Sequence, residues 1–164
     1  MRKVLYLIVT SLLLTTCGGQ GQTPPSSPLA EARATAAVDA DGGEEPLVVF
    51  QRAPEGAESL EEYRFYAGGR AAIITAASGG VEVSEAQLEA ETVNALLQNL
   101  EGADFFETAD AGEQQWTDTI DYLITASRDG EVRSLAIDEV TSQTSVKRMQ
   151  SLVVLERFVF EQVQ

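Results

Sequence analysis

The sequence of 164 residues contains no histidine, and Cys17 is its only cysteine. Without histidine, the chain cannot form a Ser-His-Asp or Cys-His catalytic site, or a metal site with an imidazole ligand. It also contains neither a Gly-x-Ser-x-Gly nucleophile motif nor a Gly-x-Gly-x-x-Gly nucleotide-binding motif. Catalysis by paired carboxylates remains open, because the spacing of such a pair is spatial and cannot be read from sequence. We expect a protein that is not an enzyme and uses no cofactor and no metal ion.

Basic residues are scarce, with 11 lysines and arginines against 26 aspartates and glutamates and a net charge of −15. A chain this acidic is repelled by nucleic acid and by anionic lipid head groups, and it attracts cationic partners. We therefore expect no nucleic-acid partner. Solubility in an exposed compartment is the alternative explanation of the charge, so the charge alone identifies no binding partner.

Long apolar runs are also missing, because the longest one, Val4 to Leu14, falls well short of the roughly 20 residues that cross a membrane. This run follows the basic pair Arg2-Lys3, as in the signal peptide of a secreted protein. The residues Leu14-Thr15-Thr16-Cys17 resemble the cleavage site of bacterial lipoproteins, in which an invariant cysteine follows the cut. The resemblance implies a signal peptide over residues 1–16 and acyl chains on Cys17 that hold the protein on a membrane. The alternative is a plain secretory signal with an incidental cysteine.

The same resemblance implies an extracytoplasmic location. Gly18 stands where lipoproteins retained in the inner membrane commonly have aspartate. The lack of this aspartate implies the outer membrane in a cell with two membranes, and the outer face of the plasma membrane in a cell with one. Residues 17–46, rich in Gly, Pro, Ser, Ala and acid, are predicted to be a lipidated cysteine followed by a disordered acidic linker. The acidic run Asp39 to Glu45 lacks the glycine spacing of an EF-hand calcium loop, so we interpret it as part of this linker.

Residues 47–164 are predicted to form a single globular domain of the α+β class. Apolar residues that alternate or run together predict six short strands, with glycine pairs and an Asp-Gly pair at several of the turns between them. These strands are Leu47–Phe50, Tyr63–Ala67, Arg70–Ala77, Val81–Ala86, Ile120–Ala126 and Val132–Ile137.

Two helices are predicted from apolar residues that share one helical face. One spans Glu89–Glu101, with an alternative start at Ser84 that would compete with the preceding strand. The other spans Val146–Gln162 and is capped by Thr144 or Ser145. The expected fold is an antiparallel sheet of about six short strands with the two helices packed on one face.

The order of these elements resembles that of the emfourin family of small inhibitors of thermolysin-like metalloproteases, and of related bacterial lipoproteins. The matching pieces are Ala67-Gly68-Gly69-Arg70, Leu96 to Leu100, Ala103-Asp104-Phe105-Phe106 and Asp118-Thr119-Ile120-Asp121-Tyr122. The resemblance covers about Leu47 to Val163 and rests on packing and turn residues, so it implies the fold more than the activity. A metalloprotease partner is what it implies about binding. The family's glycine-rich segment after the first strand is here Arg52-Ala53-Pro54-Glu55-Gly56-Ala57, which departs from a Ser-Gly-Gly-like pattern.

The candidate binding residues lie in two polar loops and at the start of a strand. They are Pro54, Glu55, Gly56, Trp116, Asp118 and Tyr122. A protease inhibitor must offer a rigid loop to the protease, so that little conformational entropy is lost on binding. We predict Pro54–Ser59 and Gly112–Trp116 for that role.

Each of these candidates also has a purely structural interpretation. Trp116 is either an anchor at an interface or part of the core. Asp118 and Tyr122 either bind a partner or stabilise a turn and a buried hydroxyl. The carboxylates between Glu55 and Glu62 either face a cationic partner or are simply solvated. The predicted function is a lipid-anchored binding protein of the cell envelope with possible protease inhibition, and the alternative is a structural envelope lipoprotein with no small-molecule site.

Overall fold

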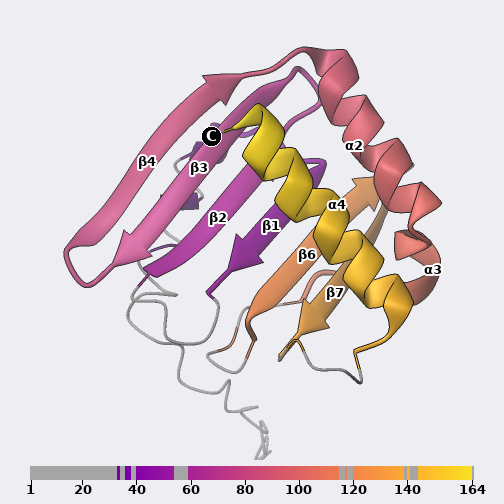
Figure 1. Ribbon diagram of the computed structural model, residues 1–164. Helices are drawn as coiled ribbons and strands as arrows, with labels where there is room; N and C mark the ends of the chain where they lie inside the picture. Colours follow the sequence, from indigo (N-terminus) through magenta and orange to yellow (C-terminus); the bar gives the residue numbers. More distant parts are fainter. Residues whose placement is uncertain are drawn as a thin grey trace, which may run out of the picture.

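The computed structural model describes residues 33, 36–37, 40–53, 59–114, 117, 120–138, 140 and 144–163. Within these ranges, one antiparallel sheet of seven strands carries two long helices on one face (Figure 1). The strands are β1 Val48–Arg52, β2 Ser59–Phe65, β3 Arg70–Ala77, β4 Gly80–Gln87, β5 Asp110–Ala111, β6 Tyr122–Arg128 and β7 Glu131–Ile137, in the spatial order β4-β3-β2-β1-β6-β7-β5. The helices are α2 Ala90–Gly102, α3 Phe105–Thr108 and α4 Val146–Gln162. The predicted α+β class is confirmed, with a strand count slightly above the prediction.

The main core lies between the sheet and the helices. Strand residues that face the helices, such as Phe50 and Phe65, are fully buried because every second side chain of a strand points to the same face. Leu96 of α2 and Leu155 of α4 belong to the same buried cluster. The ring of Phe65 meets that of Phe158 edge to face, with centroids 5.1 Å apart. The helices are thus fixed to the sheet by part of the apolar stripes from which they were predicted, since Val153 and Phe160 of the α4 stripe are exposed.

Local sequence signals determine the turns and the helix ends. Asp129 and Gly130 both have positive φ, 53° and 79°, as a two-residue hairpin turn requires. Ser145, not Thr144, caps α4, because its side-chain oxygen accepts a hydrogen bond from the backbone nitrogen of Arg148. Ser84 lies inside β4, so the later start that we predicted for the helix after it is confirmed.

Several boundaries differ from the sequence-based prediction, including that of β1, which continues to Arg52 and does not end at Phe50. The strand predicted at Tyr63–Ala67 begins earlier, at Ser59, and ends at Phe65, so Glu61 and Glu62 lie in a strand and not in a solvated loop. Its pairing with both neighbouring strands extends over the polar residues as well. The structure also contains the short strand β5, which was not predicted and is paired with β7 at the edge of the sheet. The strand predicted from Ile120 begins at Tyr122.

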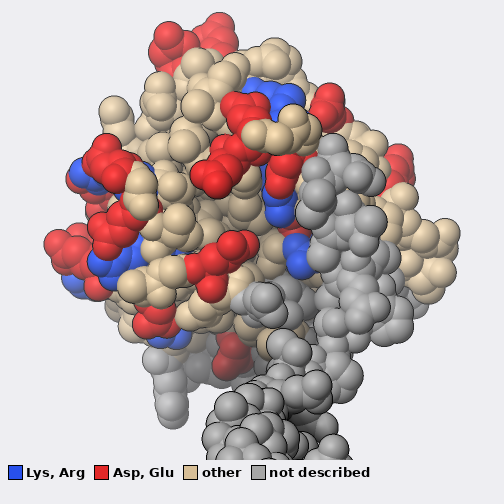
Figure 2. All heavy atoms as spheres, turned by 180° about the vertical axis from the view of Figure 1, so that it is seen from behind, with Lys and Arg blue, Asp and Glu red and all other residues tan. Residues whose placement is uncertain are grey.

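The second face of the sheet is covered in part by residues of the interval 17–46, for which we expected a disordered linker. The described residues Arg33, Ala36–Ala37 and Ala40–Asp41 are helical, and Ala37 is only 2% exposed. Arg33 forms an ion pair with the buried Glu62. Figure 2 shows this face, where Asp and Glu side chains gather around a few basic ones. At least these parts of the interval are therefore in contact with the domain.

No helix in the described ranges is both long and apolar enough to cross a membrane.

Candidate functional site

The last residue of β1 and the first residue of β6 meet at one end of the sheet, and both are close in sequence to predicted binding residues. Arg52, the last residue of β1, lies opposite Tyr122, the first residue of β6. The backbone nitrogen of Ala53 donates a hydrogen bond to the carbonyl oxygen of Asp121 at 2.9 Å, so the two chains leave the sheet side by side. We call this end of the sheet, defined by Arg52, Ala53, Asp121 and Tyr122, the loop end.

Of the six predicted binding residues, the structure describes Tyr122. Pro54, Glu55, Gly56, Trp116 and Asp118 lie outside the described residues, as does Cys17. The first three directly follow Ala53, and Asp118 precedes Tyr122 by four residues. The predicted loop Pro54–Ser59 therefore begins at the loop end. The described part of the other predicted loop, residues 112–114, lies instead beside β7, where the backbone nitrogen of Gly112 donates a hydrogen bond to the carbonyl oxygen of Val132 at the far end of the β6–β7 hairpin.

A cluster of charged and aromatic side chains occupies the helix-facing side of the loop end. At its centre, the guanidinium group of Arg52 contacts Glu61 at 2.7 Å and Glu156 of α4 at 2.5 Å. Arg52 also donates to the hydroxyl of Tyr63 at 3.0 Å, and that hydroxyl donates to Glu61 at 2.8 Å. With Tyr122, these four residues form what we call the Arg52 cluster.

The charges of the Arg52 cluster stabilise one another. Burial lowers the pKa of Arg52, but the hydrogen bond to Glu61 and the nearby Tyr63 and Glu156 raise it more, so the net shift is upward. Burial raises the pKa of Glu61, but its hydrogen bonds with Tyr63 and Arg52 outweigh burial and hold the pKa below its ordinary value. Glu61 is therefore ionised at neutral pH, which suits an acceptor of hydrogen bonds and not a general acid.

Tyr122 packs on the core and meets the cluster with its polar end. Its ring stacks on that of Phe50, with centroids 6.4 Å apart and an angle of 7°. Burial raises the pKa of Tyr122, as do the negative charges of Glu156 and Asp121. Tyr122 is partly exposed, so both interpretations that the sequence left open remain compatible with its position: a packed core residue and a residue at a binding surface.

The other four members of the Arg52 cluster were not predicted as site residues. Tyr63 could have been placed on the helix-facing side, because it shares the alternation of apolar residues that predicted its strand. Arg52 could not, because its strand was predicted from a continuous apolar run that ended at Phe50. The partnership with Glu156 depends on how α4 crosses the sheet, and no local pattern in the sequence encodes that contact.

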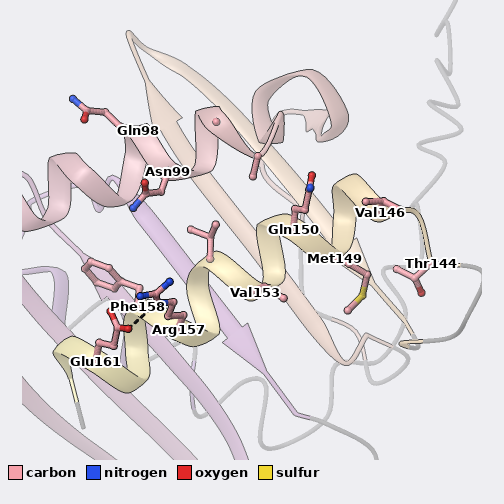
Figure 3. Close-up of a pocket in the computed structure, with 13 residues that line it drawn as sticks. Gln98, Asn99, Thr144, Val146, Met149, Gln150, Val153, Arg157, Phe158 and Glu161 are labelled. Carbon is pink, nitrogen blue, oxygen red and sulfur yellow. Dashed lines mark hydrogen bonds and ion pairs between the residues drawn. The ribbon is translucent and has the colours of Figure 1, made fainter.

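A second feature is a groove of about 870 Å³ between α2 and α4 (Figure 3). Gln98 and Asn99 line it from α2, and residues of α4 form the facing wall. Its lining mixes the apolar side chains of Met149, Val153 and Phe158 with amides and an Arg–Glu pair. Such a mixed apolar and polar lining suits contact with another protein surface.

Metal binding finds no support in the part of the chain that the structure describes, where no three Asp, Glu or Cys side chains are grouped to hold an ion. Many of the carboxylates there are instead paired with arginines.

A comparison of the sequence with models of known protein families found no match, and a comparison with curated proteins found none either.

Proposed function

We propose that this chain is a lipid-anchored binding protein of the cell envelope, and that it binds a protein partner through the segments attached to the loop end. The observation that supports this most strongly is the pairing of Arg52 with Tyr122, because Pro54 follows Arg52 by two residues and Asp118 precedes Tyr122 by four. Binding residues on loops that a rigid scaffold brings together are a common arrangement in binding proteins.

The Arg52 cluster makes the part of the sheet to which these segments are attached rigid. Arg52 is held by two carboxylates and a tyrosine hydroxyl, and Tyr63 and Tyr122 are stacked on Phe50. Because these side chains are fixed, the segments attached to the loop end lose less conformational entropy when a partner binds. Arginine and tyrosine are also the residue types most often found at the centre of protein interfaces.

The location is part of the proposal. Acyl chains on Cys17 would hold the protein on the outer membrane or on the outer face of the plasma membrane, and two or more chains suffice for stable attachment. Removal of residues 1–16 leaves nine basic residues against 26 acidic ones, a net charge of −17. A domain with this charge is repelled by anionic head groups, so attachment would depend on the acyl chains. Labelling with a fatty-acid probe should mark the wild-type chain and not Cys17→Ala, and an unlabelled wild type would refute the anchor.

The partner class implied by the resemblance is a thermolysin-like metalloprotease. We expect the full chain to inhibit such a protease and Trp116→Ala to inhibit it less, because aromatic residues contribute strongly to interfaces. Val83→Ala is the control, since Val83 is an exposed apolar residue on β4, which lies three strands away from β1 in the sheet. Inhibition that falls equally in both variants would contradict binding at the loop end.

The test also separates protease inhibition from other binding. If the protease is not inhibited, the full chain and its Trp116→Ala variant are each cross-linked to envelope proteins, and a partner lost only in the variant supports binding at the loop end. No inhibition together with no cross-linked partner would refute the proposal and leave the structural envelope lipoprotein as the explanation.

A further inference from the structure

The outer face of α4 exposes apolar side chains that no described element covers. Val146, Val153 and Phe160 are 73%, 57% and 72% exposed, and they are three of the five large apolar residues exposed in the described part of the chain. They are seven residues apart and share one side of the helix with Gln150 and Arg157. We call these five residues the α4 ridge. Apolar side chains gathered in one exposed stripe indicate an interaction surface.

The α4 ridge has the symmetry that contact between identical copies requires. Around a two-fold axis, a residue at a given distance before the axis faces the residue at the same distance after it. With the axis at Val153, Val146 of one copy faces Phe160 of the other, because each lies seven residues from the centre. We propose that two copies of this chain pack α4 against α4 in antiparallel orientation, with Val153 at the centre.

The charges beside the ridge fit this arrangement. Lys147 and Glu161 each follow a ridge residue by one position, so they flank the same side of α4 at its opposite ends. An antiparallel pair brings Lys147 of one copy close to Glu161 of the other, and their side chains are 52% and 46% exposed. Both have a partner in their own chain, but an ammonium group has three donors and a carboxylate accepts several hydrogen bonds.

The groove between α2 and α4 gives the ridge of the second copy a place to pack. Val146, Val153 and Arg157 of the ridge also line this groove, opposite Gln98 and Asn99 of α2 (Figure 3). Ridges that enter grooves are the usual mode of contact between helices. Each copy supplies one ridge and one groove, so the contact is satisfied by two copies and does not extend into a filament.

Disulfide cross-linking in the full chain tests the contact. Val153→Cys places a thiol on the proposed axis, and we expect copper phenanthroline to join two copies through it. Glu131→Cys is the matched control, because its side chain is 60% exposed, close to the 57% of Val153, and it is the first residue of β7. The parent chain controls for Cys17. Dimer yields from Val153→Cys no higher than those of the two controls would overturn the proposal.

A second cross-linking experiment tests the orientation. Differently tagged copies carrying Val146→Cys and Phe160→Cys should form a mixed dimer, whereas neither variant alone should cross-link to itself. A Phe160→Cys homodimer as abundant as the mixed dimer would overturn the antiparallel arrangement.

Charge reversal gives a readout that does not depend on cysteine. In light scattering of the full chain, Lys147→Glu alone should reduce the dimer fraction, and the addition of Glu161→Lys should restore it. Within one copy, these residues are 14 positions apart on α4, about 21 Å, so restoration must come from contact between copies. A parent chain that is monomeric at every concentration, or a double variant that stays as weak as the single one, would refute the contact.

Discussion

Replacement of Glu62 by glutamine should destabilise the fold strongly, although this position was expected to be in a solvated loop. The Glu62 side chain is fully buried on the second face of the sheet. It forms ion pairs with Arg33 and Arg64 and accepts a hydrogen bond from the side-chain nitrogen of Gln51 at 2.6 Å. In Glu62→Gln, the charge disappears, and an amide group that donates hydrogen bonds faces two guanidinium groups that also donate.

The expected loss of folding free energy depends on which ion pairs remain after the substitution. Removal of one partner from a buried ion pair costs roughly 3–5 kcal/mol, because a charge stays buried without compensation. Here Arg64 keeps Asp41 as a second partner, with 2.5 Å between the groups, so we expect the lower limit of about 3 kcal/mol. Arg33→Met should cost less, about 1–2 kcal/mol, because Glu62 keeps Arg64 and Gln51.

Urea unfolding of the full chain, followed by circular dichroism, measures these differences in the free energy of unfolding. Glu82→Gln is the control, because Glu82 is an exposed glutamate on β4 and its loss should change stability by no more than about 0.5 kcal/mol. If Glu62→Gln behaved like Glu82→Gln, the buried ion pairs would not contribute to the native state. If Arg33→Met alone had no effect, the contact between residue 33 and the sheet would be refuted.

Three further changes test other parts of the fold. Burial and the hydrogen bond to Asp41 raise the pKa of Tyr66 to about 12. The stability that protonated Tyr66 provides should therefore be lost as pH rises from about 10 to about 12. In urea unfolding, Tyr66→Phe should lose less stability than the parent chain over that interval. Ser145→Ala should cost about 1 kcal/mol in urea unfolding, because α4 loses its cap, and an equally stable variant would refute the cap. Gly69→Ala should clearly lower the melting temperature, because φ at Gly69 is 86° and a Cβ there would lie 2.3 Å from a backbone oxygen. Gly68→Ala is the control and should change the melting temperature little, because Gly68 has open space around its Cα.

What the sequence could predict depended on contacts that are local in the chain. The cap of α4, predicted at Thr144 or Ser145, and the turn at Asp129-Gly130 each follow from a few neighbouring residues, and the structure confirms both. The apolar stripe predicted for α4 is confirmed only in part, because Val153 and Phe160, which we expected to share its packed face, are exposed. The early start of β2 could not be predicted, because Glu61 and Glu62 become compatible with a buried strand only through arginines elsewhere in the chain. Patterns of hydrophobicity treat such residues as solvated, since they do not include partners that are distant in sequence.

The candidate site likewise combines a residue that the sequence predicted with residues that it could not predict. Tyr122 was predicted as a site residue from its spacing with Asp118, but Arg52, Glu61 and Glu156 join it from three different elements. The fact that these elements meet at the loop end depends on the register between β1 and β6, which the sequence alone does not reveal.

The contacts of the N-terminal interval also bear on how a membrane-anchored copy would be arranged. Residues 18–32 separate the proposed anchor at Cys17 from Arg33, and 15 residues span at most about 50 Å. Arg33 contacts the second face of the sheet, whereas α4 lies on the opposite face. The tether therefore joins the domain on the side away from the α4 ridge, so that anchoring and association through the ridge do not compete for the same surface. Because the loop end is a separate part of the sheet, a dimer could still offer two such ends to a partner, and the partner would then be bound more tightly by two attached copies than by one.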